Sequence, residues 1–218
     1  MPRIKVCGVT DAAFAVEAAR RDVDYLGLIF AAGSPRQVTM EKAREIVAQV
    51  RSGAVAVSVK PPGFVGVFVR HSPAEIVDVA SRVGLDVIQL HGDYDDSAVA
   101  MLKANGYEVW RLFNEVGSAA GANGGVFCVE LPEDAVLLDG RRGNESRRAD
   151  WSLVAPLKQA GRRVVLAGGI SAGNIAAAVA TGADVIDVNS SIETSPGVKS
   201  VDRLDELLRS VDRRRFQV

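Results

Sequence analysis

Short runs rich in β-branched residues alternate with alanine-rich amphipathic stretches along the whole chain. Alternation of this kind is typical of an α/β protein, in which crossover helices lie outside a parallel sheet. We expect strands at residues 3–7, 25–30, 64–69, 86–90, 108–113, 135–139, 163–167 and 185–189. We expect helices at residues 11–20, 39–50, 73–83, 94–104, 151–160, 172–180 and 200–211.

Eight predicted strands in 218 residues favour a single domain, residues 1–218, whose sheet closes into a (βα)8 TIM barrel. The alternative is an open doubly wound sheet, but no G-x-G-x-x-G segment follows the first predicted strand. The fifth unit is the weakest, because residues 115–126 contain four glycines and glycine disfavours a helix. We therefore predict a short or degenerate fifth helix.

Composition excludes several classes of protein. A formal net charge of -1 offers no general attraction to nucleic acid or to a membrane surface, and no apolar run approaches the ~20 residues that span a bilayer. The two cysteines, Cys7 and Cys128, and the two histidines, His71 and His91, lack metal-ligand spacing, so we expect no metal. Two free thiols, and no signal-peptide core near the first residue, favour a cytoplasmic protein.

Candidate catalytic residues end two of the predicted strands. The carboxyl ends of the strands carry the site in a (βα)8 barrel, and there Cys7 follows the first strand and Asp139 the sixth. A thiol and a carboxyl on opposite sides of the barrel mouth suit proton removal at one atom and proton donation at another. The alternatives are that Cys7 is a small buried apolar residue and that Asp139 caps a loop.

Two loops are candidates for binding phosphate. Gly168 and Gly169 follow the seventh predicted strand, and Ser190 and Ser191 follow the eighth, which are the usual phosphate positions of this fold. Glycine lets backbone N–H groups approach an anion closely. The glycines alone would also be explained by tight turns, but two such loops together favour a small phosphorylated ligand.

Three further polar residues are candidate ligands of the substrate. Arg36 follows Ser34-Pro35 in the loop after the second strand, where a guanidinium suits a planar anion. Gln89 and His91 share one face of the fourth strand, so both point inward if either does. They either contact substrate or form a hydrogen-bonded pair in the core.

Lys5 lies two residues before Cys7, so the two side chains share a face of the first strand. If the thiol points into the mouth, Lys5 points into the barrel beneath it and requires a partner. Asp187 lies on the eighth strand, which neighbours the first in a closed barrel, and we predict a Lys5–Asp187 ion pair. The ammonium would favour the thiolate of Cys7, although Asp187 would offset part of that effect.

Taken together, these motifs resemble those of the phosphoribosylanthranilate isomerases, in the right order and over nearly the full chain. The matching segments are Lys5–Thr10, Gly27–Phe30 with Ser34–Arg36, Val65–Val69, Gln89–Gly92, Leu166–Ile170 with Asn174, Asp187–Ser190 with Glu193, and Pro196–Lys199. The resemblance implies a cofactor-free Amadori rearrangement in tryptophan biosynthesis. It implies that Asp139 protonates the ribose ring oxygen of N-(5′-phosphoribosyl)anthranilate and that Cys7 then removes the proton at C2. It also implies that Asp187 contacts substrate and that the enzyme is a monomer or homodimer.

Two departures from the family pattern stand out. Residues 140–149 replace a glycine-rich loop with an arginine-rich one, which we expect to be mobile without ligand and to contact substrate through arginine on closure. The alternative is a solvated, disordered charged loop that does not contact substrate. Asn189-Ser190-Ser191 stands where the family tends to Ser-Ser-Gly, so Ser191 would either crowd the phosphate or donate a hydroxyl to it. The alternatives are a divergent enzyme for another phosphoribosyl or sugar-phosphate substrate and a non-catalytic binder of a phosphate ligand.

Overall fold

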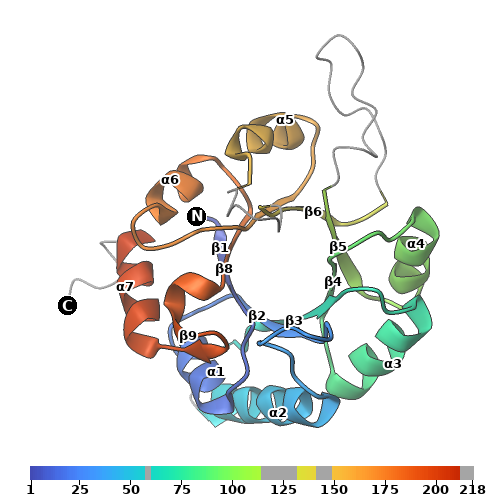
Figure 1. The fold of residues 1–218 in the computed structure, drawn as a ribbon, viewed down its shortest axis with the longest axis horizontal. Helices are drawn as coiled ribbons and strands as arrows, with labels where there is room; N and C mark the ends of the chain where they lie inside the picture. Colours follow the sequence, from blue (N-terminus) through green and yellow to red (C-terminus); the bar gives the residue numbers. More distant parts are fainter. Residues whose placement is uncertain (57–59, 114–131, 141–148, 212–218) are drawn as a thin grey trace.

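Eight parallel strands close into a barrel in strand order β1 to β8, and the helices lie outside it (Figure 1). This computed structural model describes residues 1–56, 60–113, 132–140 and 149–211. The strands are β1 Arg3–Cys7, β2 Tyr25–Ile29, β3 Gly63–Phe68, β4 Val87–Leu90, β5 Glu108–Leu112, β6 Ala135–Leu138, β7 Val164–Leu166 and β8 Val185–Val188. The predicted (βα)8 barrel is confirmed. The segment expected to hold a degenerate fifth helix, and Cys128, lie outside the described residues.

The helices begin where the sequence supplies caps. They are α1 Ala12–Ala19, α2 Met40–Ala56, α3 Pro73–Val83, α4 Asp96–Ala104, α5 Val154–Gln159, α6 Ile175–Ala180 and α7 Val201–Val211, with a 3-10 turn, η1, at Trp151–Leu153. Ser72 accepts a hydrogen bond from the Glu75 amide while the Glu75 carboxylate accepts one from the Ser72 amide, which completes a capping box before α3. The Thr39 hydroxyl accepts from the Lys42 amide at the start of α2. None of the helices in these described stretches combines the length and apolar character that crossing a membrane requires.

Apolar side chains fill the space between strands and helices, and a second cluster fills the barrel itself. Inside the barrel, Tyr25 and Trp110 pack edge to face with ring centroids 5.1 Å apart. Nearer the mouth, Cys7 packs with Ile29 and Val67 in a small separate cluster. The strands therefore point alternate side chains into an interior that is largely apolar, with the buried polar side chains of Lys5, Gln89 and Asp187 near the mouth.

A short hairpin after β8 was not predicted. It follows the 3-10 turn η2, Ser190–Ile192, and pairs β9 Glu193–Ser195 with β10 Val198–Lys199 in antiparallel fashion. Its turn contains Gly197, whose φ is +86°, and the Gly197 carbonyl accepts a 2.6 Å hydrogen bond from the Thr10 hydroxyl. The hairpin is thereby tied to the loop after β1, at the edge of the mouth.

Candidate active site

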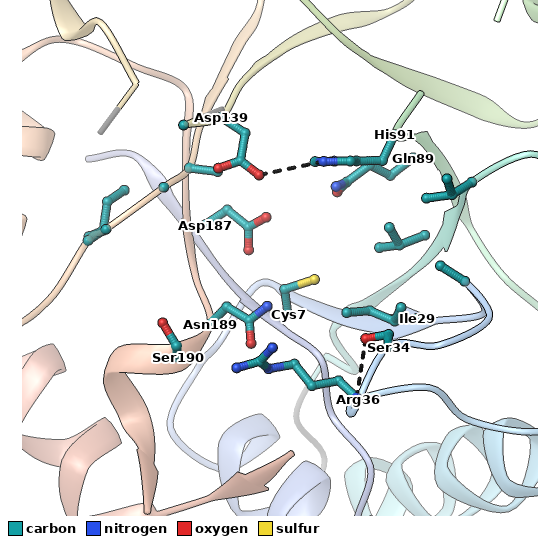
Figure 2. Close-up of a pocket in the computed structure, with 18 residues that line it drawn as sticks. Cys7, Ile29, Ser34, Arg36, Gln89, His91, Asp139, Asp187, Asn189 and Ser190 are labelled. Atoms are coloured by element: carbon teal, nitrogen blue, oxygen red, sulfur yellow. Dashed lines mark hydrogen bonds and ion pairs between the residues drawn. The ribbon is translucent and has the colours of Figure 1, made fainter. Parts of the chain in front are cut away.

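A cavity of about 320 Å³ opens at the carboxyl ends of the strands, where the sequence predicted the site (Figure 2). Its lining brings together nine of the ten predicted site residues: Cys7, Arg36, Gln89, His91, Asp139, Gly168, Gly169, Asp187 and Ser190. Only Ser191 is not among the residues that line the cavity. Residues from β1, β4, β6, β7 and β8 thus meet at one place although they are far apart in sequence.

Cys7 lies in the wall of this cavity and its side chain is nearly inaccessible, since the residue is 5 % exposed. Gly27 on β2 makes room for the thiol, because a Cβ at Gly27 would lie 2.9 Å from the Cys7 sulfur. Burial raises the pKa of the Cys7 thiol above its ordinary value, and the cations of Lys5 and Lys199 offset only part of that rise. The expected effect of Lys5 is present, since its ammonium lowers the pKa of the thiol and Asp187 offsets part of that lowering, but loss of hydration outweighs it and leaves the pKa raised.

The predicted Lys5–Asp187 ion pair is present beneath the thiol. The two residues are paired across β1 and β8, and Lys5 Nζ donates a 2.6 Å hydrogen bond to Asp187 Oδ2. Burial alone would lower the pKa of Lys5, but Asp187 and Cys7 together outweigh it and raise that pKa, so the ammonium stays charged. The other carboxylate oxygen, Asp187 Oδ1, is buried and has no hydrogen-bond partner among the described residues.

Asp139 faces the cavity from the opposite side, just after β6. His91, just after β4, points toward it across the mouth, with His91 Nε2 3.9 Å from Asp139 Oδ2 (Figure 2). Both side chains are partly open to water, at 24 % for His91 and 28 % for Asp139. Gln89 lies two residues before His91 and is buried. Its Oε1 has no hydrogen-bond partner in the described part of the chain, so this oxygen is not satisfied by the alternative of a hydrogen-bonded pair with His91.

Arg36 lines the cavity from the loop after β2, but in this structure its guanidinium is paired with the carboxylate of Glu193. Its Nε and one terminal nitrogen donate to the two oxygens of Glu193, at 2.8 and 2.6 Å. Lys199 Nζ donates to Glu193 as well, at 2.8 Å. Burial alone would raise the pKa of Glu193, but these cations outweigh it and lower that pKa to about 2.

Glu193 and Lys199 were missed as site residues. The sequence offered one signal, since a carboxylate and an ammonium flank the Pro196-Gly197 turn and a hairpin would bring them together. That hairpin was not predicted, so the pairing with Arg36 was not expected either. Asn189 belongs to the predicted phosphate loop after β8 but was given no role of its own, although it lines the cavity.

Residues from both predicted phosphate loops, Gly168, Gly169 and Ser190, line the same cavity. Gly168 and Gly169 have φ values of +85° and +69°, which glycine adopts without strain. A Cβ at Gly168 would lie 2.6 Å from the Gly140 nitrogen and 2.8 Å from Asp139 Oδ1, so this glycine also lets β6 and β7 carry their loops close together. Ser190 contributes to the lining, whereas the Ser191 hydroxyl is buried without a hydrogen-bond partner among the described residues. The predicted arginine-rich loop lies almost wholly outside the described residues.

The fold and the cavity define a (βα)8-barrel protein in which a thiol, a carboxyl group and two glycine-containing loops line one cavity at the carboxyl ends of the strands. A family model described as N-(5′-phosphoribosyl)anthranilate (PRA) isomerase matches residues 4–210. The chain belongs to this family.

Relatives of known name agree with this assignment. An N-(5′-phosphoribosyl)anthranilate isomerase of Rubrobacter xylanophilus is 35 % identical over 92 % of this chain and 94 % of its own length. A tryptophan biosynthesis protein TrpCF of Vibrio cholerae is 34 % identical over 95 % of this chain, but the chain spans only 41 % of that longer relative. The solved phosphoribosyl anthranilate isomerase in complex with reduced 1-(o-carboxyphenylamino)-1-deoxyribulose 5-phosphate superimposes with a TM-score of 0.74, at 28 % identity and covering 97 % of this chain and 98 % of that one.

Proposed function

We propose that the chain isomerises N-(5′-phosphoribosyl)anthranilate to 1-(2-carboxyphenylamino)-1-deoxyribulose 5-phosphate by an Amadori rearrangement in tryptophan biosynthesis. The observation that carries the proposal is the placement of Cys7 and Asp139 on different sides of one cavity. The names of the relatives and the ligand of the solved family member support the choice of substrate.

Asp139 acts first, as the general acid. Its carboxyl group donates a proton to the ribose ring oxygen, the bond from that oxygen to C1 breaks, and C1 and the anthranilate nitrogen form an iminium cation. His91 lies across the mouth, with its Nε2 3.9 Å from Asp139 Oδ2. Partial exposure of Asp139 lets it exchange protons with water between turnovers.

Cys7 acts second, as the general base. Its sulfur takes the proton from C2, and the electron pair of that bond neutralises the iminium to give an enol-amine, which tautomerises to the ketone. A buried thiol with a raised pKa is a poor base in the empty site. The iminium cation beside the sulfur lowers the pKa of the thiol, so Cys7 first releases its own proton to water in the open cavity. The resulting thiolate then takes the proton from C2.

The rest of the cavity accounts for the other parts of the substrate. Backbone N–H groups around Gly168 and Gly169, together with Ser190, bind the phosphate. Arg36 binds the anthranilate carboxylate with the N–H groups that Glu193 does not use. The unpartnered oxygens of Gln89 and Asp187 at the floor of the cavity accept hydrogen bonds from ribose hydroxyls.

The test is an assay of the purified protein that follows the loss of phosphoribosylanthranilate fluorescence. We expect turnover without added metal or cofactor. If the protein binds the substrate without converting it, it is a non-catalytic phosphate-ligand binder; if it neither binds nor converts it, a different sugar phosphate is the substrate. We further propose a monomer or homodimer, which light scattering would distinguish, in a reducing compartment such as the cytoplasm, as the free thiol of Cys7 favours.

A further inference from the structure

We propose that Asn189 is a substrate-binding residue whose amide N–H₂ group binds the substrate carboxylate beside Arg36. Asn189 follows β8 and lines the cavity together with Arg36 (Figure 2). The proposal rests on the proposed function, which supplies a ligand with a carboxylate at one end and a phosphate at the other. Asn189 is uncharged and is not a glycine, so the charged residues and glycine loops that indicated the rest of the site did not single it out.

Lys199 determines which way the Asn189 amide faces. Lys199 Nζ donates to the backbone oxygen of Asn189 at 2.9 Å, to Asn189 Oδ1 at 2.7 Å and to Glu193 at 2.8 Å. An ammonium has three donors and no acceptor, so the side-chain atom of Asn189 that faces it must be oxygen. The amide nitrogen therefore lies on the other side, and Figure 2 shows it directed toward Cys7. It has no hydrogen-bond partner among the described residues.

Asn189 and Arg36 converge on the same spot over Gly8. A Cβ at Gly8 would lie 2.7 Å from Arg36 Cδ and 3.0 Å from Asn189 Oδ1, so a glycine is needed for both side chains to cross there. The two are also linked through one atom, because Glu193 Oε1 accepts from Arg36 Nε and from Lys199 Nζ, both at 2.8 Å. Asn189 Oδ1 therefore lies against the Arg36 side chain, so the Asn189 amide and the Arg36 guanidinium border the same part of the cavity.

The charge balance of this cluster favours an anion as the ligand. Arg36 and Lys199 carry one positive charge each and Glu193 carries one negative charge, which leaves a net charge of +1. Lys199 donates all three of its N–H groups to Asn189 and Glu193 and its side chain is 1 % exposed, so it presents no donor to the cavity. Arg36 donates two of its five N–H groups to Glu193. The donors left for a carboxylate are the remaining guanidinium N–H groups and the Asn189 amide.

The experiment compares two ligands by calorimetric titration: reduced 1-(o-carboxyphenylamino)-1-deoxyribulose 5-phosphate and the same compound without its carboxyl group. Asn189→Asp keeps an oxygen for Lys199 and the shape of the side chain, but it replaces the N–H₂ donors with a negative charge. We expect Kd for the carboxylated ligand to rise by about tenfold to a hundredfold, as for loss of a charge-assisted hydrogen bond. Kd for the ligand without the carboxyl group should change by less than about threefold.

Two further variants complete the test. Asn189→Ala removes the donors without adding charge, and it should weaken the carboxylated ligand selectively by about tenfold. Asn105→Asp adds the same charge at the exposed end of α4, far from the cavity, and should alter neither Kd. Thermal unfolding of each variant establishes that it is folded at the temperature of the titration.

Other outcomes overturn the proposal. Equal weakening of both ligands in the Asn189 variants would mean that the amide contacts the phosphate or the sugar instead. Unchanged affinity for both ligands would mean that the amide contacts no part of them. If the wild-type protein binds neither ligand, the proposed function fails and the role of Asn189 fails with it. If the wild-type protein binds the carboxylated ligand and the Asn189 variants bind it equally well, the proposed function stands and only the role of Asn189 fails.

Discussion

On the β1–β8 side of the barrel mouth two charged groups are buried and paired at hydrogen-bond distance, whereas on the β4–β6 side the titratable side chains of His91 and Asp139 are partly exposed and farther apart. Lys5 and Asp187 are 2.6 Å apart with side chains 0 % and 5 % exposed. His91 and Asp139 are 3.9 Å apart with side chains 24 % and 28 % exposed. The proposed base lies on the first side and the proposed acid on the second.

This difference suits the two proton transfers. Cys7 must act on a carbon-bound proton, so a dry wall that holds its sulfur in one place favours the geometry of the step. Asp139 must regain a proton after each turnover, so it benefits from contact with water. Removing one partner of the buried Lys5–Asp187 pair would be costly, because it would leave the other charge buried and uncompensated.

The largest expected effect is on kcat, and it should be similar for the proposed base on the β1–β8 side and the proposed acid on the β4–β6 side. Cys7→Ser and Asp139→Asn should each lower kcat by about 10²- to 10⁴-fold, because each removes one proton-transfer group. Circular dichroism and thermal unfolding should show both variants folded. Turnover close to that of the wild type in either variant would remove that residue from the mechanism, and with it the contrast between a buried base and an exposed acid.

The next largest effect is on the free energy of unfolding, which should differ between variants on the two sides of the mouth. Lys5→Met should lower the free energy of unfolding by about 3–5 kcal/mol, because it leaves the Asp187 carboxylate buried without its cation. His91→Asn on the open side should lower it by less than about 1 kcal/mol, since pairs in contact with water contribute little. Urea unfolding at pH 7 measures both. Similar losses in the two variants would show that the sides do not differ in rigidity.

A pH series tests the buried side through Glu193. Its pKa is lowered from 4.5 to about 2 in the folded protein, so its ion pairs stabilise the fold above pH 4.5 and that contribution is lost as the pH falls toward 2. Urea unfolding between pH 6 and pH 3 should therefore show a steeper loss of stability for the wild type than for Glu193→Gln. Parallel curves would mean that Glu193 has an ordinary pKa and does not hold Arg36.

The smallest effect concerns the thiol. Lys199 is one of the cations that offset the rise in the pKa of Cys7, after Lys5 and behind burial. Lys199→Met should therefore raise the pKa of the thiol further, by less than about one unit. The pH dependence of alkylation, measured in a Cys128→Ser background so that one thiol reacts, would detect this. A lowered pKa would contradict the assignment of Lys199 to the same electrostatic cluster.

Much of the barrel and of its mouth could be predicted from the sequence. The alternation of element types determines a parallel sheet, and the end of each strand determines which residues lie at the mouth. The Lys5–Asp187 pair followed from parity, because residues two apart share a face and the first and eighth strands are neighbours in a closed barrel. These inferences depend on local periodicity and on closure, and both are properties of the chain order.

Two features were decided only by the tertiary structure. The pairing of Arg36 with Glu193 joins residues 157 positions apart through a hairpin too short to show a strand pattern, so no local signal could predict it. The raised pKa of Cys7 has a similar origin, because the sequence shows a nearby lysine but not how completely Ile29 and Val67 exclude water from the sulfur. Burial depends on how all eight strands pack around one atom, and that is determined only when the barrel has closed.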